Sequence, residues 1–262
     1  MKNAEQLESI LAHLHLQAVL PALEDLCEHS IEIQKLLTHG NFFLRFHVLF
    51  GPETILAFQN GKIRKIENNP PFSNSLTLHF LTCSQLNKMF LKRGISIPLP
   101  SCQLWNLPKL KTFQRIASEM ESSLKSSDKA LEQPEMLHRY ACMTLRLMVR
   151  AAVVLVEQEK KSREILQSGP SGIVQFEIAN RPAGACWLEW KDDRIKMVPG
   201  FSRLTPDTSI TFKNPSILRQ AALNQLDSQA AIGHGDIVVK GLIPLADTVG
   251  LVLERIALYL EP

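Results

Sequence analysis

Strict alternation of apolar and polar residues marks several short segments in the second half of the chain. In "IVQFEIA", Val174, Phe176 and Ile178 alternate with Gln175 and Glu177, and the same period recurs in "CWLEW" and "SITF". A period of two residues predicts strands with one buried face. Turn-forming groups such as "NRPAG" and "KDD" separate these segments at spacings that allow hairpins. The pattern therefore predicts a mostly antiparallel or mixed sheet.

Apolar residues three or four positions apart predict helices around this sheet. One helical pattern runs from Glu5 to Thr38, where Pro21 is expected to end or kink a helix, and another runs from Pro134 to Leu166. A further helix is expected to begin at Pro215, with Asn214 as its N-cap. The order of helix, strands, helix, strand and helix predicts an α+β module with its helices on one face of the sheet.

This pattern occurs twice along the chain. The segment "FFLRFHVLFGPETILAFQNGKIRKI" aligns with "GIVQFEIANRPAGACWLEWKDDRIKMV", and "LWNLPKLKTFQRIASEMESSL" aligns with "GLIPLADTVGLVLERIALYL". The alignment pairs Phe46 with Phe176, Leu56 with Leu188, Phe58 with Trp190, Ile63 with Ile195, Leu76 with Ile210, Pro108 with Pro244, Ile116 with Val252 and Leu124 with Leu260. The polar segment "KSSDKALEQPE" separates the two copies. We therefore expect two tandem modules, residues 1–130 and 131–262.

The last helix of the second copy is apolar around most of its circumference. Its core-facing stripe is expected to consist of Leu242, Leu245, Ala246, Val249, Leu253, Ile256 and Leu260. Leu251, Val252 and Leu258 widen this stripe beyond what a surface helix needs. Three things would cover the additional side: the other module, a second subunit, or an apolar ligand between helix and sheet.

Composition narrows the function classes. The 262 residues contain 45% hydrophobic residues, enough for a globular core, and the formal net charge is only +3 with scattered basic residues. Nucleic acid is therefore an unexpected partner. The five cysteines are far apart and form no CxxC, which favours reduced thiols in a cytoplasmic protein. The N-terminal segment carries Glu5 and Glu8 where a secretory peptide needs apolar residues, and no segment is suited to cross a membrane.

The second copy resembles a known family. The segments "GIVQFEI", "WLEWKDDRIKMVPG", "PDTSITF" and "GHGDIVVKGLIPLADTVGLVLERI" resemble the sterol carrier protein 2 (SCP-2) domain in the order of their strands and of the closing apolar helix. The resemblance covers about Ser171 to Leu260, and it is weaker over Asn41 to Leu124. It implies an α+β fold with a five-stranded sheet and an apolar tunnel that binds fatty acyl chains, acyl-CoA, sterols or other lipids.

The first copy departs from this pattern. In place of "GHGDIVVKG" it has "RGISIPLPSCQLWN", in which Pro98 and Pro100 lack the N–H donors of an interior strand. Its last helix is also more polar. We expect this strand to be missing or confined to an edge, and the second copy to be the better lipid site.

The sequence thus predicts that the protein binds a hydrophobic lipid-like ligand without catalysing a reaction. If it also releases this ligand, it would deliver the ligand from one place to another. The apolar residues expected to line the cavity lie on the strands and the last helix of the second copy: Phe176, Leu188, Trp190, Ile210, Phe212, Ile237, Val239, Leu245, Val249, Leu253, Ile256 and Leu260. No cofactor is expected. The alternative is an interaction or scaffold module whose apolar helices are buried in an interdomain or homodimer contact. A membrane that the protein contacts transiently is a further expected partner.

Two other groups of residues are candidates for chemistry. His234 and Asp236 in "GHGD" would form a pair for acid–base chemistry, but the sequence offers no nucleophile to accompany them. The eight histidines form no HExxH or other metal-binding spacing, and the glycines near Gly235 do not match GxGxxG. We therefore expect no catalytic residues and no metal site.

Overall fold

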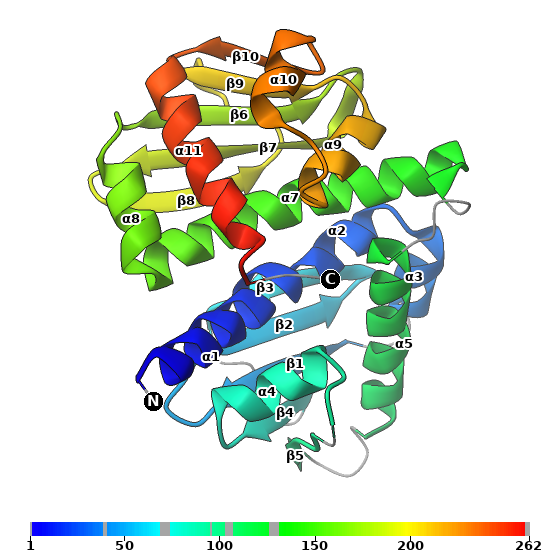
Figure 1. Cartoon of the computed structure of the whole chain (residues 1–262). Coiled ribbons are helices and arrows are strands. Elements are labelled where there is room, and N and C mark those ends of the chain that lie inside the picture. The colour runs from blue at the N-terminus through cyan, green and yellow to red at the C-terminus, as the bar shows by residue number, and fades with distance from the viewer. Residues whose placement is uncertain are drawn as a thin grey trace. The chain divides into compact units, whose positions relative to one another are not determined.

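The computed structural model describes residues 2–38, 41–68, 74–94, 96–102, 107–125 and 131–259. It divides into two compact units, Met1–Lys125 and Ser126–Pro262. The first is drawn in blue to green and the second in green to red in Figure 1. The expected module boundary near residue 130 falls at residues 126–130, which lie outside the described part of the chain.

The first unit combines one sheet with helices. Its elements are α1 (Lys2–Leu14), the π-helical η1 (His15–Val19), α2 (Ala22–Glu28), α3 (Ile31–Leu36), β1 (Phe42–Val48), β2 (Glu53–Gln59), β3 (Lys62–Ile66), β4 (Ser75–Phe80), α4 (Cys83–Phe90), β5 (Leu99–Cys102) and α5 (Leu107–Leu124). The five strands lie in the order β3-β2-β1-β4-β5. β1 is parallel to β4, and the other neighbours are antiparallel.

Proline shapes this unit at two places. The N-terminal helical segment is interrupted before Pro21, which has no N–H to continue the hydrogen-bond ladder, and α2 begins immediately after it. β5, which contains Pro100, lies at the sheet edge and pairs with β4 alone among the described strands. An edge position suits a strand that lacks a donor, so the expectation of an edge strand is confirmed.

The second unit repeats this arrangement. Its elements are α7 (Pro134–Gln158), α8 (Lys160–Gln167), β6 (Gly172–Ile178), β7 (Arg181–Lys191), β8 (Arg194–Pro199), β9 (Thr208–Phe212), α9 (Pro215–Ala222), α10 (Ser228–Gly233), β10 (Ile237–Gly241) and α11 (Ile243–Ile256). The strand order β10-β9-β6-β7-β8 is the order of the first sheet read from its other edge, and β6 is parallel to β9. The expected α+β fold with two five-stranded modules is confirmed.

Strand register supports most of the predicted pairing between the copies. Phe58 faces Ile63 in the first sheet as Trp190 faces Ile195 in the second. One pair was misaligned by two residues. In the parallel pairs, Phe46 lies beside Leu78 and Phe176 lies beside Ile210, so Leu78, rather than Leu76, corresponds to Ile210. A slip of two keeps the same face of a strand, which is why the apolar pattern did not reveal it.

Two helices of the second unit, α9 and α10, begin at residues whose side chains cap them. Asn214 caps α9 as expected, because its Oδ1 accepts a hydrogen bond from the Ile217 amide at 3.0 Å. α10 falls outside the predicted elements, since six residues carry too little periodicity to predict a helix. Its cap is Asp227, whose Oδ1 accepts from the Gln229 and Ala230 amides.

Candidate functional site

The predicted apolar residues of the second sheet share one face. Register places Phe176 beside Ile210 and Ile210 beside Val239, while Phe212 lies beside Ile237. Leu188 and Trp190 follow on β7 at the same parity. All are at most 8% exposed except Val239 on the edge strand, which is half-buried. The structure thus places the seven predicted sheet residues on one face of the sheet, and their role in ligand binding stays a prediction.

α11 lies on the same side of the sheet as α7, and Figure 1 shows it crossing the strands. Leu245 and Val249 are at most 1% exposed and Ile256 is 8% exposed, while Leu253 is half-buried. Leu260 lies outside the described residues. The helix packs against α7, α8 and strands β6, β9 and β10. Four of the five predicted helix residues therefore turn at least partly inward.

The expected stripe was too wide. Val252 is buried at 1% exposure, but Leu251 is 50% and Leu258 is 65% exposed. Leu242 is also 40% exposed, because it is the N-cap residue of α11 and lies before the first turn. A helix of this length buries only the side that meets its neighbours, so these three leucines are not part of the core stripe.

The joint between β10 and α11 is tightly built around Asp207. The Asp207 carbonyl accepts from the Leu242 amide at 2.8 Å, and its Oδ2 accepts from the Ile173 amide at 2.8 Å. Thr208 Oγ1 donates to the Leu242 carbonyl at 2.9 Å. Gly241 has φ of +98°, and a Cβ built there would lie 2.1 Å from the Asp207 carbonyl oxygen. The joint therefore requires glycine at position 241.

A polar cluster holds the other end of α11, and we call it the Glu159 latch: Glu159, Ser162, Arg255 and Tyr259. Glu159 interrupts the helix between α7 and α8 and is 8% exposed. Its carboxylate accepts from Arg255 Nε at 2.9 Å and from Tyr259 Oη at 2.7 Å. Arg255 Nη2 and the Ser162 hydroxyl donate to it as well. The latch ties the last helix to the α7–α8 junction.

Sequence reasoning missed this latch. Glu159 and Arg255 are 96 positions apart. In the sequence, each of them looks only like one of the polar residues on the solvent side of its helical segment. Nothing in either segment indicates the partner. The one available signal is that Glu159 ends an otherwise apolar helical run.

The surroundings of the latch shift two pKa values strongly. Burial alone would raise the pKa of Glu159, but hydrogen bonds from Arg255, Ser162 and Tyr259 lower that pKa to about 2. Burial, followed by the Glu159 carboxylate, raises the pKa of Tyr259 to about 12. The carboxylate is thus ionised and the phenol neutral across the physiological range, so the latch stays formed there.

These shifts predict how stability depends on pH. Because the folded-state pKa of Glu159 is depressed, its contribution is full above about pH 4.3 and is lost as pH falls through about 2. The raised pKa of Tyr259 gives a contribution that is full below about pH 10 and is lost as pH rises through about 12. Urea unfolding midpoints measured from pH 2 to 11 should fall less steeply on the acid side in Glu159→Gln. Equal acid slopes in both proteins would contradict this assignment.

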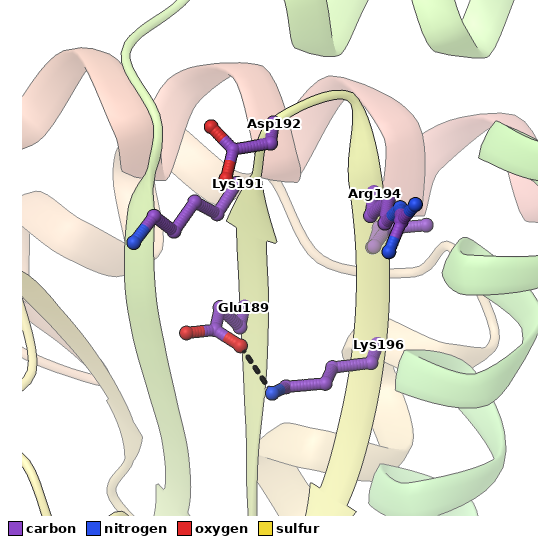
Figure 2. Close-up of a pocket in the computed structure, with 6 residues that line it drawn as sticks. Glu189, Lys191, Asp192, Arg194 and Lys196 are labelled. Atoms are coloured by element: carbon purple, nitrogen blue, oxygen red, sulfur yellow. Dashed lines mark ion pairs between the residues drawn. The ribbon is translucent and has the colours of Figure 1, made fainter.

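The hollow in Figure 2 is not the predicted apolar cavity. It has a volume of about 620 Å³ and is lined by Glu189, Lys191, Asp192, Arg194, Ile195 and Lys196. Figure 2 shows Glu189 and Lys196 forming an ion pair across the β7–β8 hairpin. By strand register, this pair lies on the opposite face of the sheet from Trp190. Charged walls disfavour an apolar chain, because burying unpaired charge is costly. The helix-covered face of the sheet is therefore the better candidate for a hydrophobic ligand.

The two residues considered for acid–base chemistry, His234 and Asp236, are not arranged as a catalytic pair. Asp236 pairs with Lys213 at 3.0 Å, and His234 is exposed at the end of α10. Within the described ranges, no group of three or more His, Cys, Asp or Glu side chains is placed to hold a metal ion. Among the described residues, no helix is long and apolar enough to cross a membrane.

Comparison with known proteins bears on the fold. No protein-family model matches the sequence, and no curated protein matches it. Similar solved structures include the sterol carrier protein domain 2 of Helicoverpa armigera, with 19% identity over 45% of this chain and 92% of that chain and a TM-score of 0.36. Apo sterol carrier protein 2 from Yarrowia lipolytica has 19% identity over 41% and 85%, with a TM-score of 0.33.

A third similar structure belongs to an enzyme. The inverting sec-alkylsulfatase Pisa1 from Pseudomonas sp. has 15% identity over 54% of this chain and only 28% of that chain, with a TM-score of 0.30. SCP-2 domains, the family that the sequence resembles, are thus among the similar solved structures.

Proposed function

We propose that the second unit binds one hydrophobic, lipid-like molecule between its sheet and α11, and that it does so without chemistry. The observation that carries this proposal is the meeting of two extended apolar surfaces. Phe176, Ile210 and Phe212 lie on strands β6 and β9, which α11 contacts, and Leu245 and Val249 lie on the helix; all are at most 8% exposed. The order of motifs shared with SCP-2 domains supports the same ligand class.

The ligand would replace contacts that the chain now makes with itself. A fatty acyl chain, an acyl-CoA or a sterol offers apolar atoms to the same surfaces, and each buried CH₂ group contributes about 0.8 kcal/mol. Few polar contacts are then needed to hold it. Access requires α11 to separate from the sheet, and both ends of this helix are held, at Gly241 by the Asp207 joint and at Arg255 by the Glu159 latch. Exchange would therefore be gated at the latch.

The first test is native mass spectrometry of the purified protein, followed by solvent extraction of bound small molecules. We expect one lipid per chain, or uptake of added fatty acid, acyl-CoA or sterol. Leu253→Arg should abolish occupancy, because Leu253 is half-buried on the inner side of α11. Leu251→Arg is the matched control, because Leu251 is 50% exposed on the same helix and should leave occupancy unchanged.

Each result has a clear meaning. An apo mass with no uptake of any added lipid would overturn the proposal. Equal occupancy in both arginine variants, with circular dichroism showing both folded, would place the ligand away from α11.

A second candidate function rests on the outer side of α11. Ile243, Leu251 and Leu258 are 49%, 50% and 65% exposed. Their apolar surface would suit an interaction module that forms a homodimer. This alternative predicts a dimer in analytical ultracentrifugation that Leu251→Arg dissociates and Leu253→Arg does not, the reverse of the pattern expected for ligand binding.

A further inference from the structure

The Glu159 latch has the composition of a receptor for a carboxylate. Arg255 Nε donates to one oxygen of the Glu159 carboxylate at 2.9 Å, and Arg255 Nη2 donates to the other. The Ser162 hydroxyl donates to the first oxygen and Tyr259 Oη donates to the second, the latter at 2.7 Å. Each oxygen therefore accepts two hydrogen bonds, and the guanidinium holds both oxygens in the bidentate way that suits carboxylates.

This receptor lies at one end of the apolar stripe of α11. Leu245, Val249 and Val252 of the stripe are at most 1% exposed. Arg255 follows Val252 by three positions and therefore lies on the same side of the helix, with 17% of its side chain exposed. It comes ten positions after Leu245, a rise of about 15 Å along the helix. The inner side of α11 is thus apolar over most of its length and cationic at its end.

Glu159 stands at a place from which its side chain can leave the receptor. It is the C-cap residue of α7 and has extended backbone angles, with φ of −113° and ψ of 117°. This break between helices lies at the surface, since Lys160 has 87% of its side chain exposed and Glu157 is also exposed. Rotation of the Glu159 side chain would carry its carboxylate toward water, which solvates the charge well. The donors of the latch would then be available to another carboxylate.

We propose that Arg255, Tyr259 and Ser162 bind the carboxylate of a fatty acid in place of Glu159, so that Glu159 is an internal competitor for the ligand. This inference rests on the proposed function, because the acyl chain would lie between the sheet and the inner side of α11. A guanidinium with little access to water needs an anionic partner, and a fatty acid supplies one when Glu159 leaves. A fatty alcohol or a sterol offers no charge in exchange, so Glu159 stays in the receptor beside such a ligand. The latch therefore selects fatty acids over neutral lipids.

The test compares palmitate with hexadecanol, a neutral lipid of the same chain length. The dissociation constants of both are measured on the full chain at neutral pH by displacement of a fluorescent lipid, and their ratio reports the preference for the charged ligand. Glu159→Gln removes the competing charge and retains an amide for the neighbouring hydroxyls, so it should shift this ratio toward palmitate by about tenfold. Loosening of α11 alone would change both constants by the same factor and leave the ratio unchanged.

Two double variants identify the cation. Glu159→Gln combined with Arg255→Gln removes the guanidinium as well and should abolish the shift in the ratio. Glu159→Gln combined with Arg163→Gln is the matched control, because Arg163 on α8 donates to the Val156 and Glu157 carbonyls at 3.1 and 2.8 Å. This control should keep the shift. Circular dichroism verifies that each variant is folded.

A second measurement uses the wild-type protein alone. The carboxyl signal of carbon-13-labelled palmitate in the complex should show an ionised group at neutral pH, because pairing with Arg255 lowers the carboxyl pKa that an apolar pocket would raise. If both lipids bind, then a protonated carboxyl, a ratio that Glu159→Gln leaves unchanged, or a shift that survives Arg255→Gln would overturn this inference alone. Binding of neither lipid to the wild-type protein would overturn the proposed function as well.

Discussion

Glu159→Ala is expected to lower the free energy of unfolding of the second unit by about 3 kcal/mol. The substitution removes the acceptor for Arg255, Tyr259 and Ser162 together and leaves the Arg255 guanidinium, with 17% of its side chain exposed, without its carboxylate. Losing one partner of a largely buried ion pair costs more than the pair contributes, because the remaining charge is poorly solvated. Urea unfolding followed by tryptophan fluorescence measures this loss, since Trp187 and Trp190 lie in this unit.

The matched control is Glu164→Ala on α8. Glu164 forms an ion pair with Lys160, but its side chain is 57% exposed, so the expected change is below about 0.5 kcal/mol. If both variants unfold at the same urea concentration, the latch does not stabilise the fold. On the proposed function, Glu159→Ala should also speed exchange of a fluorescent fatty acid, while the control should not.

Gly241→Ala is the second substitution with a large expected effect, a loss of about 3 kcal/mol or more. A Cβ at this position meets the Asp207 carbonyl oxygen at 2.1 Å and the Thr208 Cα at 3.1 Å, and the φ of +98° is unfavourable for any side chain. Because these neighbours are backbone atoms, they cannot turn away as a side chain would. The joint must shift, and the hydrogen bond from the Leu242 amide to Asp207 should be lost. Thermal and urea unfolding of the purified variant would show the change.

Gly250→Ala is the control within the same element. Gly250 lies inside α11, and a Cβ there has no neighbour within 4 Å. Alanine favours a helix interior over glycine, so this substitution should stabilise the unit by about 0.5 to 1 kcal/mol. Similar losses in both variants would mean that the Asp207 joint has no special requirement for glycine.

These two positions define how α11 is held. The Asp207 joint fixes its start through backbone contacts, and the Glu159 latch fixes its end through side chains. Only the latch can open without rebuilding the sheet. A ligand that displaces α11 would therefore be expected to do so from the Arg255 end.

Much of the fold was predictable from local pattern. Alternation in "IVQFEIA" and "CWLEW" predicted strands whose Phe176, Leu188 and Trp190 indeed share a face, and Asn214 was correctly expected to cap its helix. Pro98 and Pro100 correctly indicated an edge strand. These signals work because side-chain period, capping and proline geometry act over a few residues.

Other features needed the folded chain. Alternation did not distinguish Leu76 from Leu78 as the counterpart of Ile210, since both positions point the same way. Apolar character alone did not show that Leu251 and Leu258 face outward, because a helical stripe has no fixed width until its neighbours are in place.

The sequence by itself determined the type and order of the strands and helices, the duplication of the module and the apolar face of the second sheet, because all of these follow from short-range period and from comparison of the chain with itself. The tertiary structure alone decided the Glu159 latch and the Asp207 joint. Each joins residues that are distant along the chain, as Glu159 and Arg255 are, and no local pattern encodes which distant groups will meet.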